Sequence, residues 1–333
     1  MKIIMAGIDH TIAGLATREK FILTGTMEEM AYREILRDPR IRGAVLLCTC
    51  NRTEIYLSCR DGFDENPFRI LCRALGQEFA PYEGVHKVRS GEALFWHLCR
   101  LACGTKSRIW GEDQILAQVK QALESARRNR AADSVLEVLF RNAITAAKQS
   151  KSLVRFTSAG RSVAGRTLAL LQEKYPAPAH VLVIGNGEVG KMVAGTLAGA
   201  GYQVTMTVRS YRHGGPDIPD GVDRVPYSDR YREMGKCEVL ISATSSPHLT
   251  VERDAFSELP RIPVLLVDLA VPRDIDPAIG AFPGVTLVDI DTLAGEQVRE
   301  DHSRQLEEID GIIAKYSRRY LSWRIRYEEL VEA

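Results

Sequence analysis

Residues 180–190, with the sequence HVLVIGNGEVG, decide the architecture of the middle of this chain. A short apolar run, typical of a buried strand, leads directly into three glycines, and a helix and a second strand are predicted over 191–200 and 202–208. In this βαβ setting Gly185 permits a tight turn, Gly187 lets a pyrophosphate approach the backbone, and Gly190 lets the helix pack on the strand. The loop predicted to bind a dinucleotide therefore comprises Gly185, Asn186, Gly187, Glu188, Val189 and Gly190; the alternative is a glycine turn without a ligand.

The strand pattern continues beyond this unit. Three more short apolar runs, 239–242, 264–268 and 286–289, are predicted strands. Their spacing is typical of a doubly wound parallel sheet, so this region is expected to form a Rossmann-type domain.

The end of the second predicted strand bears on the choice of cofactor. Folds that bind NAD often carry an acidic residue about 20 positions after the glycine loop, where it contacts the ribose 2′-hydroxyl. This chain has Arg209 instead, with Arg212 and His213 close behind. A guanidinium suits a 2′-phosphate in charge and geometry, which favours NADPH. The alternative for Arg209 is an ordinary exposed loop arginine.

The regions on either side follow other patterns. Residues 1–88 alternate predicted strands (2–8, 44–47, 54–58) with predicted helices (26–36, 66–75), which indicates an α+β layer with helices on one face of a sheet. From Ser90 onward the apolar spacing is helical, with helices predicted over 114–127, 132–154 and 162–174. Residues 293–329 read as one long charged helix with an apolar stripe. The fold class is therefore multidomain α/β, with an N-terminal α+β catalytic (substrate) domain (1–155), a Rossmann NADP-binding domain (156–292) and a long C-terminal helix (293–333).

Composition limits the classes of function. The chain has 333 residues and a formal net charge of +1, so no bulk basic character points to nucleic acid. No run of about 18 apolar residues predicts a membrane span, and the first residues lack the features of a signal peptide. Seven scattered cysteines favour a reduced, cytoplasmic protein. Cys99 and Cys103 could share a helix face near Cys48 or Cys50 and bind haem or metal, but no spacing predicts a metal site.

The segment LCTCNRTEIY (47–56) carries the most reactive groups. A polar loop between two predicted strands displays Cys50 beside Arg52, and a neighbouring cation favours the thiolate, which is the nucleophile. The alternative, a buried structural cysteine, is the common state of a lone Cys.

A nucleophilic thiol and a hydride donor in one chain suggest an ordered reaction. Cys50 could attack an activated carboxyl group to form a thioester, which hydride transfer would reduce to an aldehyde. Arg52 could hold a carboxylate, Thr49 and Asn51 could donate to substrate oxygens, and His97 is a candidate proton donor or electrophile. Polar groups able to orient an amino group follow at Ser107, Glu112, Asp113, Gln114 and Gln118, although each alone reads as surface.

These motifs together resemble the glutamyl-tRNA reductase family, which begins tetrapyrrole synthesis from glutamate. The similar segments run in order along nearly the whole chain, and the most specific are TCNRTEIY and GEDQI. They are GIDHTIAGLATREK (7–20), CTCNRTEIY (48–56), HLCRLACGTKSRIWGEDQILAQVK (97–120), VLVIGNGEVG (181–190), ISATSSPH (241–248) and DLAVPRDIDP (268–277).

The resemblance implies a role for each matching position. Cys50 would attack the aminoacyl ester of glutamyl-tRNA, His97 would matter for activity, and the glycine loop would bind NADPH. The product would be glutamate-1-semialdehyde. The implied substrate-binding positions are Thr49, Asn51, Arg52, Ser107, Glu112, Asp113, Gln114 and Gln118. The implied fold strings a catalytic, an NADP and a dimerising domain on a long helix, of which residues 293–333 would be a remnant.

Two departures from the family pattern keep alternatives open. Lys106 and Arg108 stand where acidic and apolar residues are usual, and the C-terminal dimerising region is short. The alternatives are a related NADPH-dependent reductase acting on another substrate in tetrapyrrole metabolism, and a non-catalytic regulatory relative. With little net charge, the chain is expected to bind glutamyl-tRNA weakly, and its terminal helix leaves open a homodimer.

Overall fold

The computed structural model describes residues 1–107, 114–154, 162–209, 218–294 and 302–332. The chain divides into two compact units, one made of residues 1–157 and 298–333 (unit 1) and one made of residues 158–297 (unit 2). The predicted divisions at residues 155 and 292 stay predictions, although the last helix packs within unit 1 and not as a separate part.

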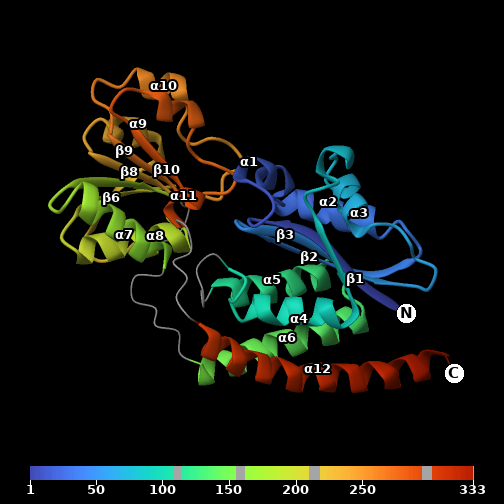
Figure 1. The fold of residues 1–333 in the computed structure, drawn as a ribbon. Coiled ribbons are helices and arrows are strands. Elements are labelled where there is room, and N and C mark those ends of the chain that lie inside the picture. The colour runs from blue at the N-terminus through green and yellow to red at the C-terminus, as the bar shows by residue number, and fades with distance from the viewer. Residues whose placement is uncertain (108–113, 155–161, 210–217, 295–301, 333) are drawn as a thin grey trace. The chain divides into compact units, whose positions relative to one another are not determined.

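Unit 1 is built on a four-stranded antiparallel sheet with the strand order β2-β3-β1-β4. All eight residues of the central strand β3 are buried, because helices cover both faces of the sheet, α2 and α3 on one and α4, α5 and α6 on the other (Figure 1). The helices α2 and α3, which come from residues 1–88, lie on one face as predicted, and helices from later in the chain cover the other face. The strands are β1 (Lys2–Asp9), β2 (Ile41–Thr49), β3 (Arg52–Cys59) and β4 (Lys87–Ser90), of which β4 was not predicted.

Local sequence signals fix several helix starts in unit 1. The Asn66 side chain accepts a hydrogen bond from the Phe68 backbone N–H, with Pro67 in the first turn, and Asp133 accepts from the Leu136 N–H. Both are typical N-caps. The helices are α1 (Leu15–Arg18), η1 (Glu19–Phe21), α2 (Gly25–Ile35), α3 (Pro67–Ala74), η2 (Ala80–Tyr82), α4 (Gly91–Ala102), α5 (Gln114–Arg128), α6 (Ser134–Leu153) and α12 (Ser303–Glu332).

The terminal helix α12 belongs to unit 1. Its apolar residues Ile309, Ile313, Tyr316 and Tyr320 are buried against α6 and α4, and the Phe95 and Tyr320 rings stack 5.1 Å apart. The buried part of the predicted apolar stripe therefore packs within unit 1. The predicted single helix over 293–329 is also wrong, because Leu293 lies in a separate short helix that contacts α7 of unit 2.

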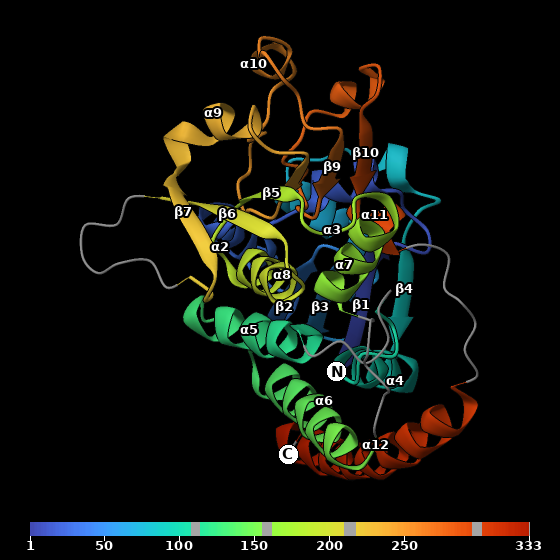
Figure 2. The ribbon, with the colours of Figure 1, turned by 90° about the vertical axis from the view of Figure 1, so that its left-hand side faces the viewer.

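Unit 2 is a sheet of six parallel strands in the order β10-β9-β8-β5-β6-β7. Separate apolar cores lie on its two faces, one under α7 and α8 and one under α9 and α10 (Figure 2). The chain reverses its direction across the sheet between β5 and β8, and the crevice at such a switch point is where ligands bind in this architecture.

The elements of unit 2 follow the predicted alternation, with β7 as an addition. The sequence predicts that the helix after the glycine loop begins at residue 191, whereas in the structure it begins at Glu188. Among the described helices of the chain, none is both long and apolar enough to cross a membrane. The elements are α7 (Val163–Lys174), β5 (His180–Ile184), α8 (Glu188–Gly199), β6 (Gln203–Val208), β7 (Val222–Pro226), η3 (Tyr227–Asp229), α9 (Arg230–Met234), β8 (Val239–Ser242), α10 (Arg253–Ser257), β9 (Leu265–Asp268), η4 (Pro277–Ala281), β10 (Thr286–Asp289) and α11 (Ile290–Ala294).

Candidate functional site

Cys50 lies at the tip of a tight hairpin in unit 1. Strands β2 and β3 pair up to Thr49 and Arg52, so Cys50 and Asn51 form a two-residue turn. The Cys50 side chain is half-buried and forms no disulfide. A thiol on such a turn is held by the sheet and still accessible, as a nucleophile must be.

The backbone of this turn is fixed from three sides. The Arg18 guanidinium donates to the Cys50 carbonyl at 2.5 Å, and the His10 N–H donates to the Asn51 carbonyl at 2.9 Å. The Thr49 hydroxyl accepts from the Asn51 N–H at 3.2 Å. Arg18 is only 1% exposed, so this cation is buried to hold the turn. Sequence reasoning assigned no role to Arg18 or His10.

Arg52 belongs to a buried charge network behind the turn. One guanidinium nitrogen donates to Glu54 Oε1 at 2.9 Å and the other to the Lys106 carbonyl at 2.6 Å. His97 Nε2 also contacts Glu54 Oε1 at 2.9 Å, and the Tyr56 hydroxyl donates to Glu54 Oε2 at 2.5 Å. Glu54, which the sequence analysis did not single out, is therefore the centre that links Arg52 to His97.

The charge state of Glu54 follows from its partners. Burial alone raises the pKa of Glu54, but the charges of His97 and Arg52 and the hydrogen bonds from His97 and Tyr56 outweigh it, and the pKa falls well below its usual range. A carboxylate can only accept, so the hydrogen in the 2.9 Å contact lies on His97 Nε2. His97 Nδ1 is buried and has no hydrogen-bond partner among the described residues.

Gly7 makes room for this network. It lies directly across from Glu54 in the β1–β3 pair, and a Cβ there would come within 2.7 Å of Glu54 Cγ. Any larger residue would displace the Glu54 side chain from His97. The strict alternation of β3 places Arg52, Glu54 and Tyr56 on the same face, and this period was the one signal in the sequence for the network.

The remaining predicted substrate residues are less closely joined. Ser107 is buried immediately after Lys106, next to the loop that Arg52 binds. Gln114 and Gln118 lie one turn apart on α5, both half-buried, and α5 packs on β2. Glu112 and Asp113 lie outside the described residues.

The cysteines do not converge on one another. The Cys48 sulfur lies near Phe21 and Thr53, on the face of the sheet opposite to α4. Cys99 and Cys103 are buried on α4, where Cys103 donates to Ser150 and burial raises the pKa of its thiol to about 11. The suggested grouping of Cys48 with this pair is therefore wrong. No cluster of His, Cys, Asp or Glu in the described parts of the chain has the arrangement of a metal site.

The glycine loop of unit 2 has the geometry that its sequence predicted. Gly185 has φ +107°, and a Cβ there would lie 2.5 Å from the Ala243 carbonyl oxygen. A Cβ at Gly190 would overlap the Gly185 carbonyl oxygen, so helix and strand can pack only if this residue is glycine. At Gly187 a Cβ would meet nothing within 4 Å, which leaves open space beside the start of α8. A helix start with open space beside it suits a phosphate group.

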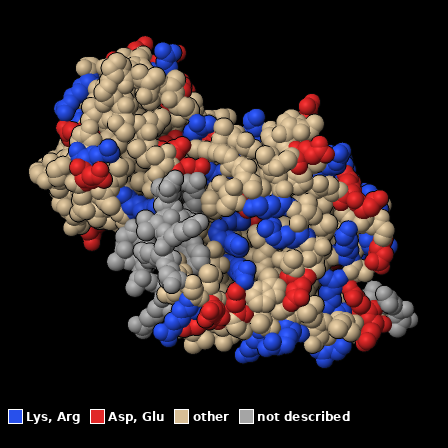
Figure 3. All heavy atoms as spheres, in the orientation of Figure 1, with Lys and Arg blue, Asp and Glu red and all other residues tan. Residues whose placement is uncertain are grey.

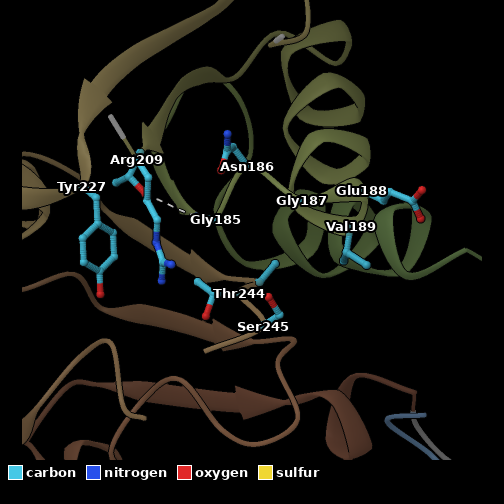
Figure 4. A pocket seen from close by; sticks show the side chains of 11 residues that line it. Gly185, Asn186, Gly187, Glu188, Val189, Arg209, Tyr227, Thr244 and Ser245 are labelled. Atoms are coloured by element: carbon cyan, nitrogen blue, oxygen red, sulfur yellow. Dashed lines mark hydrogen bonds between the residues drawn. The ribbon is translucent and has the colours of Figure 1, made fainter. Parts of the chain in front are cut away.

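A pocket of about 470 Å³ opens at this loop (Figure 4). Arg209 and Tyr227 stand on one side of it, with the Arg209 guanidinium 5.6 Å from the Tyr227 ring centre, and Thr244 and Ser245 stand on another. Backbone, hydroxyl groups and one cation make this lining fit a dinucleotide. It comprises Gly185, Asn186, Gly187, Glu188, Val189, Thr207, Arg209, Tyr227, Ala243, Thr244 and Ser245; Gly190 supports the loop from behind.

Two buried carboxylates support the far side of the pocket. Asp274 accepts from the Thr244 N–H at 2.8 Å and from the Ser242 hydroxyl at 2.7 Å, and Asp268 accepts from the Asp274 and Ile275 N–H groups. Burial raises the pKa of both, that of Asp268 to about 7. The segments 241–248 and 268–277 carried a family resemblance but no assigned role; their function here is to hold Thr244 at the pocket.

Comparisons with known proteins agree with both halves of this description. The family model described as "Glutamyl-tRNAGlu reductase, N-terminal domain" matches residues 6–153, and that of "Shikimate / quinate 5-dehydrogenase" matches residues 168–296. The chain is 48% identical to a glutamyl-tRNA reductase of Alkaliphilus oremlandii and 45% identical to one of Acetivibrio thermocellus, with 97% of each chain covered.

A solved structure is similar as well. The glutamyl-tRNA reductase from Methanopyrus kandleri has 28% identity and a TM-score of 0.50, over 98% of this chain and 81% of that one. Since two relatives are covered over 97% of their length, a short C-terminal region does not distinguish this chain from proteins that bear the name.

Proposed function

This chain belongs to the glutamyl-tRNA reductase family, and from that premise we propose that it is an NADPH-dependent oxidoreductase that converts the glutamyl group of glutamyl-tRNA to glutamate-1-semialdehyde for tetrapyrrole synthesis. The observation that carries the proposal is the turn at Cys50. The Cys50 thiol is accessible, while the Arg18 guanidinium holds the Cys50 carbonyl and the His10 backbone N–H holds the Asn51 carbonyl.

In the proposed first step the Cys50 thiolate attacks the ester carbonyl carbon. A C–S bond forms and the ester C–O bond breaks, with its electron pair on the ribose oxygen, which takes up the proton that the thiol released. NADPH, when bound, supplies a hydride to the thioester carbon. The C–S bond then breaks with its electron pair on sulfur, which restores the thiolate and releases the aldehyde.

Arg52, Thr49 and Asn51 flank the nucleophile and are the proposed contacts of the glutamyl group, together with Ser107, Gln114 and Gln118. Because Arg52 already donates to Glu54 and Lys106, its orientation is set before substrate arrives. His97 reaches the turn through Glu54, which supports a role in orienting Arg52.

NADPH is the proposed cofactor because the pocket at the glycine loop carries Arg209. The loop Gly185–Gly190 would hold the pyrophosphate at the start of α8, and Arg209 beside Tyr227 would hold the 2′-phosphate. The positive charge of the guanidinium favours a phosphate over a hydroxyl group at this position.

The experiment is a single-turnover reaction of the purified protein with glutamyl-tRNA and NADPH, in which the aldehyde is trapped and the acyl-enzyme is detected by radioactive glutamate. Cys50→Ser should form no thioester and no aldehyde, because a hydroxyl is a much weaker nucleophile at neutral pH. It should bind NADPH as the wild type does. Aldehyde formation by Cys50→Ser at a comparable rate would refute the nucleophile, and NADPH binding without aldehyde from the wild type would favour a related reductase with another substrate.

Two further expectations complete the proposal. We propose a cytoplasmic location, which the lack of any disulfide among the seven cysteines supports. We also propose a homodimer through α12, where Leu321, Ile325 and Leu330 are exposed on one helix. Sedimentation velocity on the wild type and on Ile325→Glu tests the dimer. A charge among these exposed apolar residues should convert a dimer to a monomer, whereas the control Glu307→Gln should leave the sedimentation coefficient unchanged.

A further inference from the structure

A group of cationic side chains adjoins the Cys50 turn in unit 1. Arg52 follows the turn directly, and Lys106 is joined to it through the 2.6 Å bond between the Arg52 guanidinium and the Lys106 carbonyl. Lys87 and Arg89 lie on one face of the edge strand β4, and Arg100 holds the Lys106 loop because its carbonyl accepts from both the N–H and the hydroxyl of Thr105. We name these five residues the cation cluster.

Three carboxylates balance three of the five charges. Lys87 pairs with Asp9 at 3.2 Å, Arg52 pairs with Glu54 at 2.9 Å, and Arg100 makes a two-pronged contact with Asp310 at 2.6 and 3.0 Å. Arg89 and Lys106 have no acidic partner among the described residues. The cluster therefore carries two cations in excess.

Solvent can reach those two cations. Lys106 is exposed and Arg89 is half-buried. Partial burial and then the charges of Arg100, Arg89, Arg52 and Lys87 lower the pKa of Lys106, as expected where like charges are crowded. Figure 3 shows Lys and Arg side chains gathered in the middle of the displayed face of unit 1. Crowded cations that are not neutralised within the fold favour an anionic ligand.

The proposed reaction indicates which anion it is. The ester that Cys50 would attack is attached directly to the terminal ribose, so the last phosphates of the acceptor strand must lie within a nucleotide or two of the thiol. We propose that the cation cluster, through Arg89 and Lys106, binds the backbone phosphates of the 3′-terminal nucleotides of glutamyl-tRNA. This inference rests on the proposed function.

The basic residues of the terminal helix are another candidate site for tRNA phosphates, and the cation cluster is the alternative to them. Lys315, Arg318 and Arg319 of α12 are exposed, but Lys315 and Arg319 lie over the Tyr316 ring on a helix that packs on α4 and α6. A few phosphate contacts beside the thiol are consistent with weak overall binding of tRNA and precise placement of its end.

The test compares two glutamyl esters, one of adenosine, which has no phosphate, and one of the trinucleotide CCA, which has two. Lys106→Gln and Arg89→Gln should each raise KM for the trinucleotide ester about fivefold to tenfold, with kcat little changed, because each removes a charge-assisted contact. Neither should change KM for the adenosine ester. Lys106→Arg, which keeps the charge, should behave as the wild type, and Lys315→Gln with Arg318→Gln is the matched control on α12.

Salt dependence gives a second measure. Binding of the unesterified trinucleotide CCA should weaken with salt, and its log–log slope should fall by about 0.7 for each phosphate that a variant no longer neutralises. This assay needs no turnover, so it tests the cluster even if the wild type forms no aldehyde. An equal rise in KM for both esters would show that Lys106 binds the glutamyl carboxylate, and unchanged KM values and slopes would show that the cluster binds no phosphate; either result overturns the inference.

Discussion

Replacement of Glu54 by glutamine tests whether the buried network holds unit 1 together. The amide is nearly isosteric, and its oxygen can still accept from Arg52 and His97 while its NH2 group faces the Tyr56 hydroxyl. What the variant loses is the negative charge beside a guanidinium that is only 3% exposed. Leaving one member of a buried ion pair without its partner costs about 3–5 kcal/mol.

The expected loss is therefore about 4 kcal/mol in the free energy of unfolding of unit 1, or about 2 M in the urea midpoint for an m-value of about 2 kcal/mol per M. Trp96 and Trp323 lie in unit 1 and the sequence of unit 2 holds no tryptophan, so tryptophan fluorescence reports the unfolding of unit 1. Glu29→Gln is the control, because its carboxylate is exposed at a distance of 3.8 Å from Arg33 and should contribute less than about 0.5 kcal/mol.

Low pH should reduce the difference in the free energy of unfolding between the wild type and Glu54→Gln. The pKa of Glu54 is lowered in the folded protein from an unfolded value of 4.5, so its stabilisation is fully present above pH 4.5 and is lost as pH falls toward the folded pKa. The gap between the wild type and Glu54→Gln should then narrow by up to about 1.4 kcal/mol per pH unit below 4.5. A gap under 0.5 kcal/mol at pH 7, or one that stays constant to pH 3.5, would refute the assignment of Glu54 as a stabilising carboxylate.

Unit 2 allows two further predictions. Arg209→Asp should weaken NADPH binding by about 1.5–3 kcal/mol and leave NADH nearly unaffected, as measured by the dissociation constants of both nucleotides; an unchanged ratio would place the 2′-phosphate elsewhere. Gly185→Ala should destabilise unit 2 by about 3 kcal/mol, since φ is +107° and the new Cβ meets the Ala243 carbonyl, whereas Gly187→Ala should keep the fold and lose cofactor affinity. Calorimetric unfolding and nucleotide titration separate the two, and Gly187→Ala with wild-type affinity would contradict the close approach of the pyrophosphate.

The parts of the molecule that sequence could predict are those fixed by local pattern. Gly185 and Gly190 met their prediction because each answers a steric demand from residues close in the fold, such as the Gly185 carbonyl against Gly190. The positions of the strands other than β4 and β7 followed from alternation and apolar runs in the same way.

The network around Glu54 was not predictable by such means. Two of its bonds, His97–Glu54 and Arg52–Lys106, join residues 43 and 54 positions apart, and the Arg18–Cys50 bond joins residues 32 apart. No local pattern marks Arg18 or Glu54 as buried, because charged residues are usually exposed. The prediction of one long helix was wrong for a related reason. Both α11 and α12 have helical periodicity, and only their tertiary contacts separate them: α11 contacts α7, whereas α12 contacts α4 and α6.

Substitutions around the nucleophile differ in whether their effect on activity can be separated from their effect on the stability of unit 1. Arg18, Arg52 and Glu54 are buried, so removing any of them changes the fold of unit 1 and the position of Cys50 together. Lys106 contributes to the same network only through its backbone carbonyl, and its side chain is exposed. Substitutions of the Lys106 side chain therefore leave the Arg52 contact in place. It follows that loss of activity at Glu54 reports on the architecture behind the thiol, whereas a change in KM at Lys106 reports on the substrate that the thiol meets.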